Sequence, residues 1–456
     1  MIGLPPFLSF SENERTLQLK ILMIILRTVK NISSLNIAAS VLLFLAAILA
    51  AVVANSSLSP VYQDFLLQEL HLRIGNFNLF SHGGHPLKMI EFINDCLMTV
   101  FFLAVGLEIK RELLVGELSS VRKAALPFIA ACGGMVVPVV IYALSVASST
   151  PETRGMAIPM ATDIAFSLGV LSLLGKRVPL SLKIFLTAFA VVDDIGGILV
   201  IALFYSADVA YGYLIAAAVL YVFLYYMGKF GVTQKIFFLF FGVIIWYLFL
   251  QSGIHSTISG VILAFVIPAR PRLDAGKYIE RIRDIIGEFP VSKSDNIVLT
   301  NAQIATLKQV ERASDYVISP LQSLEDNLHG AVSFVILPLF AFANAGVVFS
   351  GSGSIVGDVS IAVAAGLLLG KFLGIYLFTW LAVKSGVALM PAGMNWKNIA
   401  GVSLLGGIGF TVSLFIANLS FADEYPELLN QAKFGVLVGT VLAGVLGYVV
   451  LNWVLP

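Results

Sequence analysis

The stretch VSIAVAAGLLLGKFLGIYLFTWLAV, residues 359–383, is the most informative part of this sequence. It is long and apolar enough to cross a lipid bilayer as a helix, and its one charged residue, Lys371, lies at its midpoint. A charge at the centre of a membrane helix costs about 2.5–3.5 kcal/mol even on the mildest insertion scale. We therefore expect Lys371 to have a charged partner inside the membrane.

Two other apolar stretches carry charge at about the same depth. Asp163 lies near the middle of residues 155–175, and the adjacent residues Asp193 and Asp194 lie at the middle of 184–205. Three predicted membrane segments thus place opposite charges at one level. This pattern is typical of proteins that move an ion or a proton across a bilayer.

The composition predicts a membrane protein with many spans. The chain is 58% hydrophobic and only 12% charged, whereas a soluble domain has about 25% charged residues. A net charge of +1 gives no reason to expect nucleic acid as a partner. The two cysteines, Cys96 and Cys132, lie in apolar stretches and predict neither a disulfide framework nor a metal cluster. We expect no cofactor, and the sequence lacks the GxxxxGK[ST] loop of ATP-driven transporters.

The hydropathy pattern predicts an all-α protein with twelve spans, at residues 35–54, 87–115, 124–147, 155–175, 180–205, 209–228, 234–251, 254–269, 329–349, 359–383, 397–419 and 428–455. Under this assignment 23 of the 28 Lys and Arg residues lie on one side and four on the other, with Lys371 between them. The positive-inside rule then places both termini in the cytoplasm. We expect residues 1–34 to form a cytoplasmic segment with an interfacial helix at 17–29, and residues 35–456 to form one transmembrane domain.

Two loops are long. Residues 55–86 face the outside, and 73–80 (RIGNFNLF) predict a short hairpin. Residues 271–327 face the cytoplasm and hold seven basic and nine acidic residues, which is typical of a solvated segment. We expect part of this loop, at 275–286, to be helical.

Helix-breaking residues interrupt two of the spans. Pro159 precedes Thr162 and Asp163 in GMAIPMATDIAFSLG (155–169), and Gly406, Gly407 and Gly409 lie together in GVSLLGGIGFTVSLF (401–415). Irregular backbone at membrane depth occurs only inside protein or beside water. In the predicted topology spans three to five match spans ten to twelve in inverted orientation. Paired broken helices in two inverted repeats indicate the binding site of a transporter.

Each of these features also has a plainer interpretation. Glycine-rich spans often serve close helix packing alone, and Asp163 could simply be a structural partner for Lys371. Asp193 and Asp194 are harder to explain in this way, since adjacent helical residues point about 100° apart and one lysine cannot easily pair with both. A carboxylate binds small cations and also accepts protons, so these two residues predict competition between Na⁺ and H⁺.

At these residues the chain resembles the NhaA family of bacterial Na⁺/H⁺ antiporters. The resemblance is carried by residues 94–113 (NDCLMTVFFLAVGLEIKREL), 158–186 (IPMATDIAFSLGVLSLLGKRVPLSLKIFL), 191–197 (VVDDIGG), 337–347 (LPLFAFANAGV), 366–374 (GLLLGKFLG) and 406–417 (GGIGFTVSLFIA). It implies two interrupted, crossing helices, and an ion and proton site at Asp194 and Asp193. It also implies that Lys371 pairs with Asp193, and that Thr162 and Asp163 line the crossing.

The resemblance further implies electrogenic exchange of cytoplasmic Na⁺ or Li⁺ for external protons, in Na⁺ and pH homeostasis. It implies a homodimer in the bacterial inner membrane, paired through an outer hairpin that residues 55–86 would supply. A cytoplasmic cluster linked to pH activation would comprise Glu108, Arg111, Glu112, Glu325 and His329. The chain departs from the family in its longer 271–327 loop and in Asp326, where some members carry His.

Two rival functions are possible, one within transport and one from another class of protein. A Na⁺-coupled solute symporter would need more polar residues around the broken helices than this sequence has. An intramembrane aspartyl protease needs a GxGD element and a paired YD, and neither occurs. We therefore expect an antiporter that is not an enzyme.

Overall fold

The structure is a computed structural model that describes residues 37–74, 77–82, 85–146, 151–205, 209–270, 275–287, 300–349, 354–422 and 424–455. Within these residues eight helices are long and apolar enough to cross a membrane, and two bent helix pairs raise the number to ten. The expectation of an all-α membrane fold is confirmed. Two shorter apolar helices, α9 (Lys235–Leu250) and α10 (Thr257–Val266), match the two remaining segments, so the count of twelve spans stays a prediction.

Three of the long helices contain a π-helical turn. The helix Met89–Val115 consists of α3 (Met89–Phe92), η1 (Ile93–Leu97) and α4 (Met98–Val115). The second consists of α13 (Pro320–Ala331), η5 (Val332–Ile336) and α14 (Leu337–Asn344), and the third of α15 (Asp358–Ala365), η6 (Gly366–Gly370) and α16 (Lys371–Lys384). The other long helices are Ile37–Ala54, α5 (Val121–Ser145), α7 (Leu180–Phe204), α8 (Tyr211–Lys229) and α19 (Pro426–Val454).

Both interrupted spans are broken where the sequence predicts. Span four consists of the 3₁₀ segment η3 (Pro151–Met160) and α6 (Ile164–Leu173), and span eleven of α17 (Trp396–Leu405) and α18 (Phe410–Phe421). Each pair is bent by 44°. The glycines at the second break allow a close approach, because a Cβ on Gly407 would lie 2.4 Å from the Leu367 carbonyl oxygen and one on Gly409 would lie 2.7 Å from that of Ala161.

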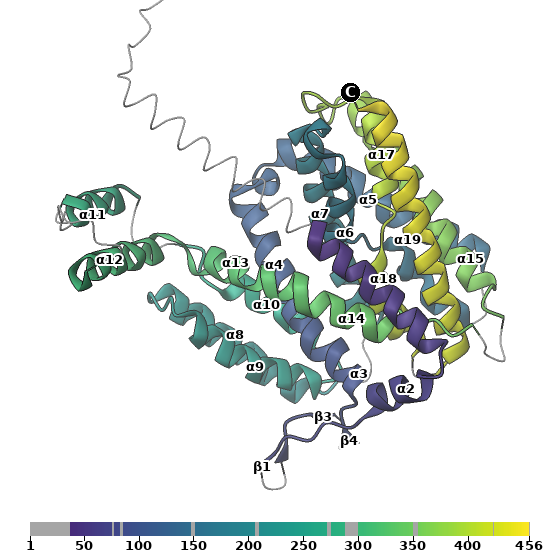
Figure 1. Cartoon of the computed structure of the whole chain (residues 1–456), viewed down its shortest axis with the longest axis horizontal. Helices are drawn as coiled ribbons and strands as arrows, with labels where there is room; N and C mark the ends of the chain where they lie inside the picture. Colours follow the sequence, from purple (N-terminus) through teal and green to yellow (C-terminus); the bar gives the residue numbers. More distant parts are fainter. Residues whose placement is uncertain are drawn as a thin grey trace, which may run out of the picture.

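The segment between the first two long helices forms one end of the molecule. It contains α2 (Ser59–Leu67) and two hairpins, β1 (Arg73–Ile74) with β2 (Phe77–Asn78) and β3 (Ser81–His82) with β4 (His85–Pro86). The predicted hairpin within 73–80 is confirmed, and the second one was not predicted. We call this end the hairpin face. Figure 1 shows it opposite the C-terminus, with α19 running between the two ends.

The long loop after α10 is shorter than expected. Residues 275–286 are helical as predicted, since α11 spans Ala275–Gly287, and α12 (Asn301–Val317) is a further helix. In Figure 1 these two helices lie apart from the bundle. The next membrane helix begins at Pro320, so the predicted start at 329 and the loop end at 327 are wrong. The Ser319 hydroxyl accepts from the Gln322 amide at 3.2 Å, and proline suits the first helical turn. The predicted helix at 17–29 lies outside the described residues.

Close packing fixes α16 against α5 at the centre of the molecule. A Cβ on Gly374 would lie 2.1 Å from the Gly133 carbonyl oxygen, and one on Gly133 would lie 2.3 Å from that of Gly374. Only glycine permits this approach, which is typical of helix pairs in membranes. The contact lies one turn beyond Lys371, and it therefore fixes the position of that residue in the interior.

Candidate functional site: a helix crossing below a charged cavity

The two breaks contact each other directly. The Thr162 hydroxyl donates to the Gly406 carbonyl at 2.8 Å, and the Asp163 amide donates to the Ile408 carbonyl at 2.6 Å. The Ser167 hydroxyl of α6 donates to Leu405 at the end of α17, and the Ser413 hydroxyl of α18 donates to Ile158 in η3. The first half of each span thus meets the second half of the other, as expected for two segments that run in opposite directions. These bonds satisfy backbone groups that the breaks leave without helical partners.

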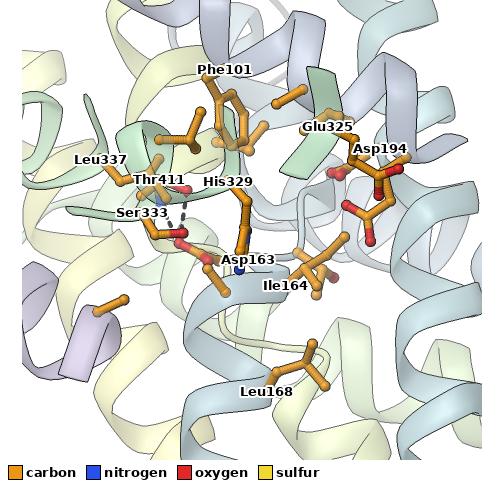
Figure 2. A pocket seen from close by; sticks show the side chains of 18 of the residues that line it. Phe101, Asp163, Ile164, Leu168, Asp194, Glu325, His329, Ser333, Leu337 and Thr411 are labelled. Atoms are coloured by element: carbon orange, nitrogen blue, oxygen red, sulfur yellow. Dashed lines mark hydrogen bonds between the residues drawn. The ribbon is translucent and has the colours of Figure 1, made fainter. Parts of the chain in front are cut away.

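Asp163 lies between the N-termini of two of these half-helices. One carboxylate oxygen accepts from the Phe166 amide of α6 at 3.0 Å, so Asp163 is the N-cap of that helix. The other accepts from the Thr411 hydroxyl of α18 at 2.7 Å and from its amide at 3.2 Å. Figure 2 shows the bonds to Thr411. A carboxylate at this position balances the positive ends of both helix dipoles.

Lys371 forms a fully buried ion pair with Asp193. The Lys371 Nζ lies 2.6 Å from the Asp193 Oδ2, and both side chains are 0% exposed. Thr162 lies beside the same carboxylate, and the ring of Phe189 lies 5.7 Å from the ammonium. Lys371 follows directly on the π-helical turn η6, a feature that often occurs at functional sites. The two spans that the sequence singled out for opposite charges are therefore brought together.

Asp194 has a different environment, because it lines a cavity of about 410 Å³. Asp193, Glu108 and Asp163 are the negative groups near it, and Lys371 is the positive one. Figure 2 shows Asp163 and Asp194 at this cavity together with Glu325 and His329. Asp194 is thus the member of the adjacent pair that an ion can reach through the cavity, whereas Asp193 is held by Lys371.

The cavity has two walls. One wall is the crossing and α7, with Thr162, Asp163, Asp194, Thr411 and Val412. The other wall is α4 and the helix α13–α14, and its lining residues include Phe101, Glu108, Arg111, Glu325, Asp326, His329 and Leu337. The charged groups of this second wall lie at the end away from the hairpin face.

Four of the five residues proposed for pH control meet at that end of the cavity. The Arg111 Nε lies 3.1 Å from the Glu325 Oε1, and Glu108 and His329 also line the cavity. Glu112 is adjacent but does not line it. Its carboxylate lies 3.5 Å from Arg111 and accepts from the Glu117 amide at 3.2 Å. Asp326, noted in the sequence as a departure from the family, also lines the cavity.

Three polar residues that belong to the same region were not among the predicted site residues. Thr411 binds Asp163, and Asn344 and Asn418 bind each other with an Nδ2–Oδ1 distance of 2.9 Å. The signal for Thr411 was present, since it follows the glycine cluster at the start of a half-helix. Asn344 and Asn418 stand in apolar helices and had no predicted partner.

Comparison with known proteins identifies close relatives. Residues 30–451 match the family described as Na⁺/H⁺ antiporter 1. The curated Na⁺/H⁺ antiporter NhaA of Bacteroides thetaiotaomicron is 75% identical over 434 residues, which are 95% of this chain and 99% of that protein. The protein of the same name from Bacteroides fragilis is equally similar, and the one from Parabacteroides distasonis is 52% identical over 426 residues, 92% of this chain and 94% of its own. The family match, over residues 30–451, includes every element that forms the crossing and the cavity.

Proposed function

We propose that Asp194 and Asp193 are the groups at which Na⁺ and H⁺ compete. The premise is that this chain belongs to the Na⁺/H⁺ antiporter family and therefore exchanges Na⁺ for H⁺ across a bacterial membrane. The observation that carries this proposal is the contrast between the two neighbours. Asp194 lines the cavity, and Asp193 lies beside it in a buried pair with Lys371. The family gives no support to the rival symporter and protease functions, and we propose that the protein carries out no enzymatic reaction.

Competition for one carboxylate is sufficient for exchange. Na⁺ enters the cavity, where Glu108, Glu325 and Asp326 add negative charge, and binds the oxygens of Asp194 in place of a proton. When the site faces the other side, a proton displaces Na⁺. Asp163 has both oxygens bonded to Thr411 and Phe166, so it supports the crossing and lines the path rather than supplying the main ligand.

The buried pair offers a second exchangeable charge. Breaking the bond between Lys371 and Asp193 frees a carboxylate for Na⁺ and allows a further proton to leave. We therefore propose that more protons enter than Na⁺ ions leave, so that each cycle moves positive charge inward. Na⁺ efflux from proteoliposomes at equal pH on both sides, with a negative internal potential set by K⁺ and valinomycin, tests this. The potential should accelerate efflux, and equal rates with and without it would indicate one-for-one exchange.

We further propose that the cavity opens to the cytoplasm and that the hairpin face is external. This assignment places both termini in the cytoplasm, as the distribution of Lys and Arg predicts, and the resemblance to the family implies the inner membrane. The hairpin segment is then available for pairing in a homodimer, and Li⁺ is a second substrate. Labelling of single introduced cysteines at Ser59 and Ser385 from each side of the membrane tests the orientation.

The charged cluster at the cavity mouth is proposed to set the pH at which exchange begins. Proton uptake and release by Glu108 and Glu325, which lie beside Arg111 and His329, would change the charge of the wall that faces Asp194. Glu325→Gln and His329→Ala should each move the pH midpoint of exchange with little effect on the maximal rate. Glu280→Gln, at an exposed carboxylate of α11, is the control. If both rate–pH curves overlay that of the wild type at high and low Na⁺, the cluster is only a solvated collar.

A further inference from the structure

A layer of three phenylalanines lies beyond the cavity on the side of the hairpin face. The cavity reaches Thr411 and Leu337, and about one helical turn further lie Phe415 and Phe340. The Phe102 and Phe415 rings are 5.7 Å apart, and the Phe340 and Phe415 rings are 6.4 Å apart. All three side chains are buried. They connect α18 on one wall of the cavity with α4 and α14 on the other.

A second layer, made of amides, lies directly beyond the aromatic one. Asn344 donates to the Asn94 Oδ1 at 2.8 Å, and its own Oδ1 accepts from Asn418 at 2.9 Å and from Asn94 at 3.3 Å. Asn94 belongs to η1, Asn344 ends α14, and Asn418 lies on α18. On α18 the residues Thr411, Phe415 and Asn418 follow one helix face, and the rise along the helix from Thr411 at the cavity to Asn418 is about 10 Å.

The two residue pairs of this amide triad differ in which elements they join. Asn94 and Asn344 are both on the wall formed by α4 and α14, so their bond lies within one wall. The bond from Asn418 to Asn344 connects that wall to α18, which is part of the crossing. It is thus a polar link across the plane along which the two walls would have to separate if the site opened toward the hairpin face.

The hairpin-face end of α14 is anchored independently of the triad. The Tyr62 hydroxyl donates to the Phe342 carbonyl at 2.6 Å, and burial raises the pKa of Tyr62 to about 12, so it remains a donor at physiological pH. Asn430 bonds both backbone groups of Val348, at 3.0 and 2.9 Å. These contacts hold the end of α14 and the segment that follows it, so the triad breaks when α18 and α14 move apart.

We propose that the Asn94–Asn344–Asn418 triad and the phenylalanine layer form the outer gate of the ion path, and that the Asn418–Asn344 bond breaks each time the site opens to the outside. The proposal rests on the exchange function and on the external assignment of the hairpin face. A site exposed alternately to two sides needs one closed barrier at a time, usually made by movement of one helix group against another. With the cavity open toward the cytoplasm, the two layers are the closed barrier.

The proposed gate predicts that a variant changes the apparent affinity for Na⁺ on one side of the membrane more than on the other. Asn418→Ala removes a bond that only the inward-facing state makes, so the outward-facing fraction should rise by roughly fivefold. Because an apparent affinity scales with the fraction of competent molecules, the apparent KM for external Na⁺ should fall by up to about fivefold. The apparent KM for internal Na⁺ should change less than about twofold, since the inward-facing state is already the main one. Both constants are measured on right-side-out and inside-out membrane vesicles.

Matched variants distinguish an effect on the gate from a general loss of stability. Asn430→Ala also removes a partly buried asparagine contact, to Val348 in the segment after α14, but outside the gate, and should leave the ratio of the two KM values unchanged. Asn94→Ala, which acts within one wall, should change the ratio less than Asn418→Ala does. If Asn418→Ala folds poorly, Asn418→Ser retains a small polar group and should shift the ratio in the same direction.

The outcomes decide between a gate and a structural link. An unchanged external KM in Asn418→Ala, an equal rise of both constants, or the same shift in Asn430→Ala would overturn the proposal. The ratio of the two constants does not depend on which carboxylate binds Na⁺. A failure of the proposed ion site therefore appears as retained exchange in Asp194→Asn, and a failure of the gate appears only in the sidedness.

Discussion

The buried pair between Lys371 and Asp193 makes a quantitative prediction about stability. Its atoms are 2.6 Å apart and both side chains are 0% exposed, so water does not screen the interaction. Removing one partner of such a pair leaves an unpaired buried charge, which typically costs about 3–5 kcal/mol. Lys371→Ala should therefore lower the free energy of unfolding by roughly that amount. Lys384→Ala on the same helix removes an exposed lysine over the Trp380 ring and should cost less than about 1 kcal/mol.

A double-mutant cycle identifies the partner. Asp193→Asn removes the charge that Lys371→Ala leaves unpaired, so the double variant should be less destabilised than the sum of the two single losses. The assay is unfolding of the purified protein in detergent, followed by tryptophan fluorescence. Losses that simply add, or a Lys371→Ala protein that unfolds like the wild type, would refute the reasoning from the pair.

Three further predictions follow from the site and its packing. Asp194→Asn should abolish exchange in proteoliposomes while the protein keeps its wild-type Tm, because the amide retains the shape but not the charge; residual exchange above about a tenth of the wild-type rate would argue for another ligand. As pH falls through the range in which the site becomes mostly protonated, the apparent KM for Na⁺ should rise by about tenfold per pH unit, and saturating Na⁺ should restore the rate of exchange. An apparent KM that does not depend on pH would exclude competition between Na⁺ and H⁺. Gly374→Ala should lower the free energy of unfolding by about 1–3 kcal/mol, because its Cβ would lie 2.1 Å from the Gly133 carbonyl oxygen. Gly212→Ala is the control, since the added atom would have open space around it and should not lower stability. Equal Tm values for both variants would show that the α5–α16 contact is not tight.

Most of the helical framework was predictable because apolar length determines it. The mid-span charges and the breaks at Pro159 and at Gly406–Gly409 were visible for a related reason, since residues that are costly in a membrane helix are informative. The start of the ninth span was misplaced because Pro320 follows a polar loop, and the cap formed by Ser319 and Gln322 was overlooked.

The details of the site depend on contacts between distant segments, which the sequence pattern does not contain. Nothing in the order of residues separates Asp194 from Asp193, yet one lines the cavity and the other pairs with Lys371. The bond from Asn418 to Asn344 could not be predicted from the sequence either, since each residue alone looks like an ordinary polar residue in a packed helix. Their functional roles stay predictions until variants are measured.

The most direct test of the account is the release of protons when Na⁺ binds to the purified protein. In weakly buffered solution at a pH where the site is protonated, added Na⁺ should acidify the medium around the wild-type protein. The same addition should produce no signal from the Asp193→Asn/Asp194→Asn double variant, which keeps the shape of the site but holds no exchangeable proton there. Proton release from the double variant at the wild-type amplitude would contradict the central claim that Na⁺ and H⁺ compete for these two carboxylates.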